Sequence, residues 1–539
     1  MNVEIVFPGP QWELLRRHLF EAVPDPDTRS IPGAPGAPSA PGTPGVDEGL
    51  AFALAAPVHS PAGVRLTVRE ILPARPQDLE HRSPVAIAPT ADFVAAALTR
   101  CRQEGWSLIE AHSHPFDHGS GTTFSGVDWS SDRAKMPRVA GLLPENALHA
   151  TMVLGRSHLD AHYYDRKSAS IRPIHRVRVL GAVGAVGAVG GRVDAPQLLR
   201  ITPTSSAATA PPTAPTAPRR RAWGRHRQDS GGAADDQRYD RQIPLIGRET
   251  QQQLAETTVA IVGLGGLGSF TALECAHLGV GRLVLVDPDT VEPSNLNRLI
   301  GATEAAVGRP KVEVYADLVR AVAPACTVDT VQDSILSSDA LGPVRAADLV
   351  LGCVDSHGAR LVLNQLAVQY VIPYLDAGSG ARLDDAHRVS RLGGQVQAVL
   401  PGLGCLECRG FIDARRAAFD LAPQHIRSRE IAHGYGTREP APSVVFLNGL
   451  VASLLVAQTV QLLSGTTPTA HAGPVPAITL CDVLTPSLLP VAAGPVDACP
   501  TCGADGVTAL ADLSPLHSAT ASAPPPAVGR TGIGGRPDA

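Results

Sequence analysis

The clearest pattern of hydrophobic and polar positions lies in residues 259–289, which read VAIVGLGGLGSFTALECAHLGVGRLVLVDPD. Two short apolar runs, residues 259–262 and 283–286, flank a segment with helical spacing that opens on several glycines. This order predicts a strand, a helix and a second, parallel strand, the β-α-β unit of a nucleotide-binding sheet. A further apolar run that begins at residue 349 predicts a strand that delivers Asp355 to its carboxyl end.

The amino-terminal third has shorter apolar segments, in which strand-like and helical spacing alternate. Helical spacing occurs at residues 11–22 and 91–101. The predicted strands are residues 2–7, 48–55, 64–72, 107–111, 151–154, 159–164 and 171–180. The pattern therefore predicts a mixed α/β domain that precedes a doubly wound, Rossmann-like domain.

Four tracts separate or end these patterned regions, because their Gly-rich and Pro-rich sequence sustains neither helical nor strand periodicity. They are residues 31–45, 181–191, 203–218 and 519–535. We therefore predict a folded domain at 1–180, a disordered linker at 181–234, a second folded domain at 235–505 and a disordered tail at 506–539. The apolar run at 447–463 predicts a buried core helix of the second domain.

Charge and composition narrow the class of protein. The formal net charge is −5 over 539 residues, which offers no argument for a nucleic-acid partner. The first residues, MNVEIVFPGPQ, lack a charged segment followed by a long apolar one, and no run approaches the roughly 20 apolar residues of a membrane span. We expect a cytoplasmic protein without a membrane partner, whose nine cysteines bind metal or react rather than form disulfides.

The sequence HSHP follows one predicted strand of the amino-terminal domain and suggests a metal site. His112 and His114 are two residues apart, so both imidazoles point to one side of the strand end and can bind one metal ion. A third ligand is then required; Asp128 is the best candidate, and Asp117 and Asp132 are alternatives. Three protein ligands leave a coordination position for water, whose pKa a zinc ion lowers to about 7.

Hydrolysis at such a site also needs a carboxylate that moves a proton from the water to the leaving amine. We assign this role to Glu48, because it opens a strand predicted beside the site, and we rank Glu70 and Glu110 below it. Together these residues resemble the JAMM (JAB/MPN) family of zinc isopeptidases, whose pattern is an upstream Glu, His-x-His-Pro and Ser-x-x-Asp. The resemblance covers about residues 1–170 and implies that Ser125 steadies the tetrahedral oxyanion.

The glycines of the second domain are Gly263, Gly265, Gly266 and Gly268. Glycines let the backbone turn sharply and approach a phosphate, whose negative charge is favoured by the free N–H groups and the dipole of a helix start. Asp287 ends the second strand of this unit, where its carboxylate can accept hydrogen bonds from a ribose. Alone, these residues predict a site for a nucleotide with a ribose.

Five motifs that follow one another over about 120 residues make this prediction more specific. They read RYDRQ, GLGGLGS, DPDTVEPSNLNR, GRPK and LGCVDSHGAR, and together they resemble the ThiF/MoeB and ubiquitin-activating enzyme family. The resemblance implies an ATP site in which the glycine loop lines the phosphates and Asp355 positions Mg²⁺. It further assigns Asp287 and Asp289 to nucleotide binding, Asn295, Arg298 and Lys311 to phosphate contacts, and Arg241 to a contact made from a second subunit of a homodimer.

Adenylation chemistry fits the residue types at this site. Attack of a carboxylate on an α-phosphate brings two anions together, so fixed cations and a metal ion supply most of the catalysis. No general base is needed, because the carboxylate is already ionised at pH 7. An enzyme that uses NAD would have little need of Arg298 and Lys311 beside the phosphates.

Two Cys-x-x-Cys elements, Cys405/Cys408 and Cys499/Cys502, predict a closed and therefore structural zinc site with four thiolate ligands. The ThiF/MoeB family carries a similar split site. Its ubiquitin-activating members also use a cysteine beyond the first of these elements to hold the carrier as a thioester. Residues 410–480 contain no cysteine, so we expect adenylation without a thioester.

The two domains together predict a JAMM-like metallopeptidase fused to a ThiF-like adenylyltransferase. The partner would be a ubiquitin-like or sulfur-carrier protein with a Gly-Gly end, which the first domain trims or releases and the second activates with ATP. One alternative is an oxidoreductase that binds NAD(P) or FAD, suggested by the glycine loop alone. Another is a non-catalytic scaffold that only binds the carrier.

Overall fold

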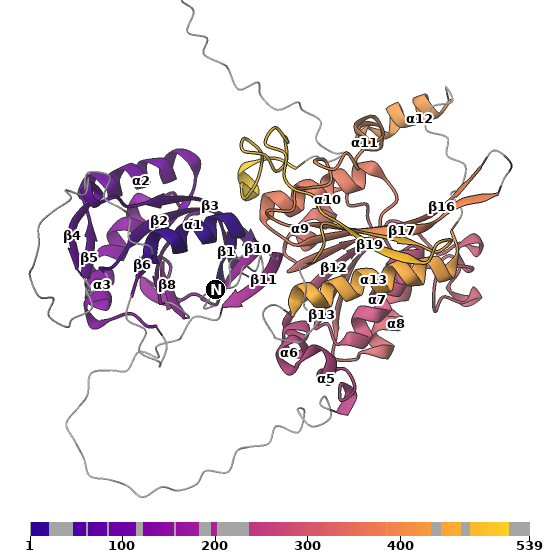
Figure 1. The fold of residues 1–539 in the computed structure, drawn as a ribbon, viewed down its shortest axis with the longest axis horizontal. Helices are drawn as coiled ribbons and strands as arrows, with labels where there is room; N and C mark the ends of the chain where they lie inside the picture. Colours follow the sequence, from indigo (N-terminus) through magenta and orange to yellow (C-terminus); the bar gives the residue numbers. More distant parts are fainter. Residues whose placement is uncertain are drawn as a thin grey trace, which may run out of the picture.

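The computed structural model contains two large β-sheets with their helices, one from each part of the chain (Figure 1). It describes residues 2–20, 47–60, 63–83, 86–114, 122–155, 158–182, 196–201, 237–384, 386, 388–432, 443–464 and 475–516. We call the elements up to residue 201 the amino-terminal unit and those of residues 237–516 the carboxy-terminal unit. The predicted tracts 31–45, 203–218 and 519–535 lie outside the described residues.

The amino-terminal unit is built on a mixed sheet of nine described strands, in the order β11-β10-β1-β3-β2-β6-β7-β8-β9. Their bounds are β1 (Asn2–Pro8), β2 (Leu50–Ser60), β3 (Gly63–Pro73), β6 (Ser107–Ser113), β7 (His149–Leu154), β8 (Leu159–Asp165), β9 (Ser170–Pro173), β10 (Arg176–Ala182) and β11 (Pro196–Ile201). β1 runs parallel to β3 and β10, and β6 runs parallel to β7. A separate hairpin pairs β4 (Leu79–Ser83) with β5 (Ala86–Pro89), after a 3₁₀ turn at Pro76–Asp78.

Three helices accompany this sheet, namely α1 (Gly9–Phe20), α2 (Ala91–Glu104) and α3 (Gly126–Leu142). α1 buries Trp12, Leu15 and Leu19, whose spacing places them on one face. α2 begins where the hydroxyl of Thr90 accepts a hydrogen bond from the third helical N–H, and it ends at Gly105 in the left-handed region. The predicted mixed α/β architecture is confirmed.

The carboxy-terminal unit has an eight-stranded sheet in its described part, in the order β14-β13-β12-β15-β16-β17-β18-β19. The strands are β12 (Thr258–Val262), β13 (Arg282–Val286), β14 (Thr327–Val331), β15 (Leu349–Gly352), β16 (Tyr374–Leu383), β17 (Val389–Val399), β18 (Ile478–Asp482) and β19 (Ser487–Val491). The first five are parallel, and the last three continue the sheet as antiparallel strands. The strand order reverses between β12 and β15, the kind of position at which such sheets bind ligands. The predicted Rossmann-like sheet is confirmed.

Helices connect and cover these strands. They are α5 (Ile243–Ile246), α6 (Arg248–Glu256), α7 (Gly266–Leu278), α8 (Lys311–Val322), α9 (Ser338–Arg345), α10 (His357–Tyr370), α11 (Ala414–Leu421), α12 (Gln424–Ala432) and α13 (Val445–Leu463), with 3₁₀ turns at Pro293–Asn295, Glu304–Ala306 and Ala511–Leu513. α13 is the one described helix long and apolar enough to cross a membrane, and half of its most apolar window is buried. It packs against α7 and β16, as the prediction of a core helix requires.

Three sequence-based boundaries were wrong. The predicted linker contains β11, which pairs antiparallel with β10 and so extends the amino-terminal sheet beyond residue 180. The predicted tail is ordered as far as residue 516, where Ala509 and Ala511 are fully buried and Gln369 donates a hydrogen bond to the carbonyl of Ala511. Glu48 precedes β2 rather than opening it. Both added segments owe their order to distant partners, which local periodicity does not reveal.

A buried group of charges joins the two units. One carboxylate oxygen of Glu4 in β1 lies 2.5 Å from Nε of Arg65 in β3 and 2.7 Å from a guanidinium nitrogen of Arg178 in β10. The same Arg178 reaches across to Asp348 of the carboxy-terminal unit, at 3.0 Å. The Arg178 side chain is only 1% exposed. Figure 1 shows β1, β10 and β11 on the side of the amino-terminal unit that faces the other unit.

Candidate functional site

The glycine loop lies between β12 and α7, at the carboxyl end of the parallel strands. Gly263 has φ of +88°, a conformation that favours glycine. A Cβ on Gly268 would lie 1.8 Å from the carbonyl oxygen of Gly263, so the first turn of α7 packs directly on the loop. Gly265 stands at the N-cap of α7 and offers no side chain to the first N–H groups of the helix. Those groups remain available to an anion.

Asp287 organises this loop. One of its carboxylate oxygens accepts a hydrogen bond from the N–H of Leu264 at 2.5 Å, and the other accepts one from the N–H of Asp289 at 2.9 Å. Burial raises the pKa of Asp287, although the charge of Lys311 lowers it in opposition. The carboxylate therefore sits at the end of β13, beside the glycine loop, where the sequence predicted it.

Lys311 is the cation closest to this carboxylate. It is the first residue of α8, and its Nζ lies 2.7 Å from Asp289 and 3.7 Å from Asp287. The Lys311 side chain is 9% exposed, whereas that of Asp289 is 63% exposed. The structure thus brings together the glycine loop, both aspartates and Lys311.

The other predicted nucleotide residues are less closely assembled. Asn295 is buried in a 3₁₀ turn, and its side-chain oxygen accepts a hydrogen bond from a backbone N–H of the same turn. Arg298 is half-buried and donates to the carbonyl of Ser294 at 2.7 Å. Asp355 follows β15 and is exposed, while the Arg241 side chain is 96% exposed. These four side chains come from three separate segments of the carboxy-terminal unit, of which Asn295 and Arg298 share one.

The sequence reasoning missed Arg360, although it lies in the LGCVDSHGAR motif. Its guanidinium donates to the carbonyl of Val354 at 2.7 Å and to both carboxylate oxygens of Asp376 at 3.2 Å. Asp376 is fully buried and also accepts a hydrogen bond from the hydroxyl of Tyr374. Arg360 therefore holds the backbone next to Asp355. Its place in the same motif, five residues after Asp355, was the available signal.

In the amino-terminal unit, His112, His114 and Asp128 form the predicted metal-ligand cluster. One potential ligand atom from each residue lies within 4.8 Å of the others. Nε2 of His112 is 3.4 Å from one oxygen of Asp128, and Nε2 of His114 is 3.3 Å from the other. The buried Nε2 of His112 makes no hydrogen bond to any described residue. An unpaired ring nitrogen facing a second imidazole and a carboxylate fits a zinc ion.

Short-range contacts hold Asp128 in place at the start of α3. Ser125 is the N-cap, and its hydroxyl accepts a hydrogen bond from the N–H of Asp128 while its own N–H donates to the Asp128 carboxylate at 2.7 Å. Burial alone would raise the pKa of Asp128, but the imidazoles of His112 and His114 beside its carboxylate outweigh that effect and hold the pKa well below its usual range. The Ser125 hydroxyl keeps its proton available to another acceptor.

Glu48 lies next to this cluster, 3.9 Å from Nε2 of His114. The segment around it is tied to the strand of the histidines, because the hydroxyl of Ser113 accepts a hydrogen bond from the N–H of Gly49 at 2.8 Å. Burial raises the pKa of Glu48, and the charges of the two histidines oppose that shift. Ser113 was also missed, since a serine between two histidines carries no distinctive sequence signal.

The alternatives that the sequence left open have other partners. Asp132 is 2.7 Å from Nε2 of His162, and Glu110 is 2.6 Å from Nζ of Lys135. Glu70 pairs with Arg100 at 2.9 Å. Asp117, the remaining alternative ligand, lies outside the described residues. Among the described carboxylates, Asp128 and Glu48 are therefore the two at the histidine pair.

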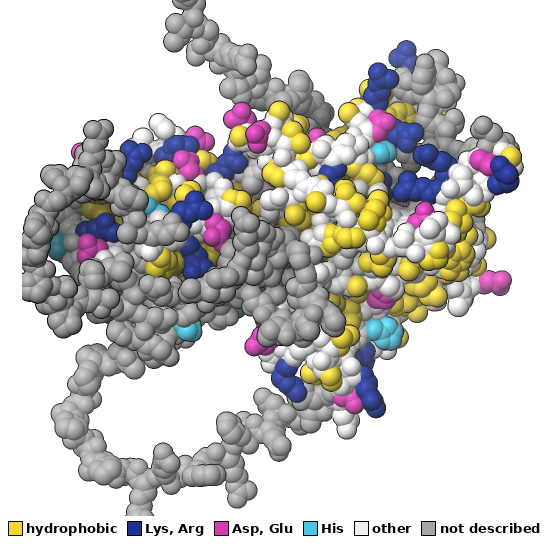
Figure 2. All heavy atoms as spheres, in the orientation of Figure 1, with side chains coloured by type: hydrophobic (Ala, Val, Ile, Leu, Met, Phe, Trp, Pro, Cys, Tyr) yellow, Lys and Arg dark blue, Asp and Glu magenta, His cyan; other side chains and the backbone are white. Residues whose placement is uncertain are grey.

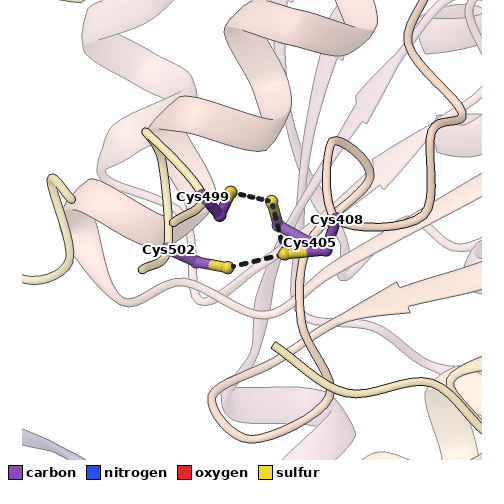
Figure 3. Close-up of side chains that lie close together, drawn as sticks. All are labelled: Cys405, Cys408, Cys499 and Cys502. Carbon is purple, nitrogen blue, oxygen red and sulfur yellow. Dashed lines mark hydrogen bonds between the residues drawn. The ribbon is translucent and has the colours of Figure 1, made fainter. Parts of the chain in front are cut away.

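The four predicted thiol ligands also come together (Figure 3). The Sγ–Sγ distances are 3.9 Å for Cys405–Cys408, 3.6 Å for Cys405–Cys499 and 3.2 Å for Cys408–Cys502. Four sulfurs around a zinc ion with bonds of about 2.3 Å would lie roughly 3.8 Å apart. The cluster fits a tetrahedral structural site, and it ties the segment after β17 to the residues that follow β19.

Comparison with known proteins concerns the carboxy-terminal unit. The ThiF family model matches residues 239–492. The sulfur carrier protein ThiS adenylyltransferase of Escherichia coli is 35% identical over 178 residues, which are 32% of this chain and 67% of the relative. The E. coli molybdopterin-synthase adenylyltransferase is 37% identical over 149 residues, which are 27% of this chain and 59% of the relative.

Two further similarities are more limited. The heterocyst protein HesA of Trichormus variabilis is 30% identical over 175 residues, which are 32% of this chain and 62% of HesA. The match thus spans less than two thirds of HesA and of the molybdopterin-synthase enzyme. A crystal structure of E. coli MccB with ATP shares 22% identity over 49% of this chain and 74% of MccB. Its TM-score of 0.39 is too low to support an inference.

Proposed function

Because the chain belongs to the ThiF family through residues 239–492, we propose that its carboxy-terminal unit joins AMP to the C-terminal carboxylate of a ubiquitin-like or sulfur-carrier protein. The relatives are named adenylyltransferases for ThiS and for molybdopterin synthase, which favours this reaction over the oxidoreductase alternative. The main structural support is one contact set: Asp287 braces the glycine loop at the start of α7, and Lys311 lies beside it.

In the proposed reaction, a carboxylate oxygen of the carrier attacks the α-phosphorus of ATP. A new bond forms between that oxygen and phosphorus, and the bond to pyrophosphate breaks, so the products are the acyl adenylate and pyrophosphate. The free N–H groups at the start of α7 and the ammonium of Lys311 stabilise the phosphate charge. No proton needs to move, because the attacking carboxylate is ionised at neutral pH.

Asp355 is the proposed ligand of Mg²⁺. An exposed carboxylate at a sheet end suits this ion, which takes one or two carboxylates together with substrate phosphates. When bound, Mg²⁺ neutralises charge on the phosphates. Arg298 is half-buried and donates to Ser294 of its own loop, whereas the Arg241 side chain is 96% exposed. We propose that Arg298 binds the phosphates of ATP and that a second subunit supplies Arg241.

The test is ATP–pyrophosphate exchange with purified candidate carriers that end in Gly-Gly. Asp355→Asn should abolish exchange, because the Mg²⁺ ligand is lost. The matched control is Asp317→Asn, which removes an exposed carboxylate that pairs with Arg309 and Arg320 on α8. Exchange that is absent in the wild type, or equal in Asp355→Asn and the wild type, would contradict the adenylation proposal.

A second function, zinc-dependent peptidase or isopeptidase activity of the amino-terminal unit, is favoured by the cluster of His112, His114 and Asp128 with Glu48 beside it. A zinc ion, when bound, supplies a water molecule of lowered pKa and a Lewis acid. We propose that Glu48 then transfers a proton from the attacking water to the leaving amine, and that the Ser125 hydroxyl donates a hydrogen bond to the oxyanion.

This second proposal is tested with a carrier precursor that has residues after Gly-Gly, or with a carrier–lysine conjugate. The wild type should contain zinc in excess of that bound by the four cysteines and should cleave the substrate. His112→Ala should lose that zinc and the cleavage. His59→Ala is the matched control, because His59 is an exposed histidine bonded to the carbonyl of Asn146. Cleavage that survives His112→Ala would exclude this site.

We also propose a homodimer through the carboxy-terminal unit. Figure 2 shows hydrophobic side chains gathered over β19 and α13 on one face, where Leu488 is 61% exposed and Phe446 is 59% exposed. A second copy that covers this face would also explain an Arg241 exposed on its own subunit. Sedimentation should show a dimer that Leu488→Glu weakens. Leu142→Glu, at an exposed leucine of the other unit, should leave the dimer intact.

A further inference from the structure

The buried charges of Glu4, Arg65, Arg178 and Asp348 form what we call the junction between the two units. They contact the carboxy-terminal sheet where two of its strands begin. Asp348 immediately precedes β15, and its backbone N–H donates to the carbonyl of Thr258, the first residue of β12. A side-chain oxygen of Asp348 also accepts a hydrogen bond from the N–H of Thr258 at 3.0 Å. The other side-chain oxygen faces Arg178 and Arg176 of the amino-terminal unit, at 3.0 and 3.3 Å. The contact is therefore made where β12 and β15 begin.

On the other side, the contact is made where three strands of the amino-terminal sheet begin. Glu4 is in register with Arg65 of β3 and with Arg176 of β10, so its carboxylate gathers their guanidinium groups. Arg65 continues into the carboxy-terminal unit, where it donates to the carbonyls of Arg345 and Ala347 at 3.0 and 3.3 Å. The two sheets thus meet through the amino-terminal ends of their parallel strands.

A second contact joins the two units beside these charges. The segment after the four-cysteine cluster lies between the units: a 3₁₀ turn at Ala511–Leu513 packs against β2, and Arg69 of β3 donates to the carbonyls of Gly506 and Thr508. Ala509 is bonded to Val368 of α10. The units are therefore joined by two separated attachments, one ionic and one through this segment.

The candidate metal site lies at the end of the amino-terminal sheet remote from the junction. Pro73, eight residues after Arg65 in β3, is in register with Ala51 of β2, and the neighbouring Leu50 is in register with His112. Eight residues of strand span about 26 Å. In Figure 1 the elements α3, β4 and β5 lie on the far side of this unit from the carboxy-terminal unit.

The nucleotide site lies at the opposite end of the other sheet. The glycine loop follows the last residue of β12, a strand of five residues that spans about 17 Å from the junction. The β16–β17 hairpin, whose first strand runs parallel to β15, points away from the amino-terminal unit in Figure 1. The two candidate sites are therefore separated by on the order of 40 Å along the strand directions.

We propose that the two candidate sites are fixed at opposite ends of one rigid body, so that a carrier cannot reach both from one docked position and passes between them through solution. The identity of the substrate in this inference rests on the proposed functions. The distance between the sites rests on the contacts at the junction. A fully extended tail would need about 12 residues to span such a distance. Trimming and adenylation by one chain are then separate encounters, and the chain does not channel the carrier between its own two sites.

The geometry is tested by electron–electron distance measurement on the full chain, with labelled chains diluted in an excess of unlabelled chains so that only distances within one chain are measured. Spin labels are attached through unnatural amino acids, because nine cysteines are present, at Val127 beside Asp128 and at Val307 before Lys311. Both side chains are exposed. The wild type should give one narrow distribution near 40 Å or beyond, and Asp348→Asn should broaden it. A wild-type population below about 25 Å would overturn the proposal.

The kinetic consequence is tested with a carrier precursor that must be trimmed before it is adenylated. The rate of adenylate formation by the wild type is compared with that of a mixture of His112→Ala and Asp355→Asn chains, in which each intact site has the same concentration as in the wild type. In a second measurement, an excess of trimmed carrier that cannot be adenylated is added as a trap. The proposal expects equal rates of adenylate formation and full sensitivity to the trap. A wild type more than about threefold faster than the mixture, or resistant to the trap, would overturn it. Failure of either single reaction would count against the proposed function, and the distance measurement would still decide the geometry.

Discussion

The two candidate sites of this chain differ in how closely their side chains are assembled. At the metal site, His112, His114 and Asp128 already lie within 4.8 Å of one another, with Glu48 adjacent. At the nucleotide site the loop, Asp287 and Lys311 are in contact, whereas Arg298 is half-buried and donates to Ser294 of its own loop. A small cation needs its ligands placed at bond length, whereas a long, highly charged nucleotide can collect its cations along its own length.

The largest expected effect is at the preassembled site. Glu48→Gln should reduce cleavage by about 10³-fold, because the proton carrier is lost while both histidines and Asp128 remain. Bound zinc should stay unchanged, as measured by metal analysis of the same preparation. Glu70→Gln removes a carboxylate that pairs with Arg100 away from the cluster, and should cleave normally. Loss of zinc in Glu48→Gln would mean that Glu48 is a ligand instead.

The next effect concerns the junction that keeps the two sites apart. Asp348→Asn should lower the free energy of unfolding by about 3 kcal/mol, because it removes one of the two described carboxylates that neutralise the buried Arg178. The measurement is the urea midpoint of the full chain, with the slope compared to that of wild type. Asp329→Asn, which breaks the exposed Arg282–Asp329 pair, should cost less than about 1 kcal/mol. Equal costs for the two variants would show that the junction is not a buried ionic contact.

Arg298 should contribute to the rate of adenylation and not to the stability of the fold. Arg298→Ala should lower ATP–pyrophosphate exchange by about 10²-fold, because one fixed cation is lost from the phosphates. Its stability should be unchanged, since its described contacts are with exposed groups of its own loop. Arg309→Ala, which removes a nearby exposed arginine paired with Asp317, should exchange normally. A large stability loss in Arg298→Ala would show that this site too is assembled in advance.

The smallest effect is the pH dependence of the junction. Burial alone would raise the pKa of Glu4, but Arg178, Arg65 and Arg176 outweigh it and hold the pKa well below its usual range. The stabilisation is therefore present above the unfolded pKa of about 4.3 and is lost as the pH falls below it. Between pH 7 and pH 4, Glu4 should account for a loss of about 0.6 kcal/mol in the free energy of unfolding. Unfolding measured from pH 7 to pH 4 should show this slope, and Glu4→Gln should flatten it.

The sequence determined the elements and the residue types of both sites. Strand and helix spacing around residues 259–289 predicted the β-α-β unit, because a parallel strand buried on both faces must be apolar along its length. The spacing of His112 and His114 placed both rings on one side, since side chains alternate along a strand. The two Cys-x-x-Cys elements likewise predicted that the four cysteines lie together. Each of these inferences depends only on local geometry or on the affinity of a residue type for one ligand.

Only the tertiary structure decided which carboxylates serve the metal site and where the sites lie. Asp132 and Glu110 are carboxylates like Asp128 and Glu48. They are instead paired with His162 and Lys135, respectively. β11, the ordered segment up to residue 516 and the contact of Arg178 with Asp348 join parts of the chain that are far apart in sequence. Such choices depend on which surfaces meet after the sheets have formed, and neither the periodicity nor the composition of a segment contains that information.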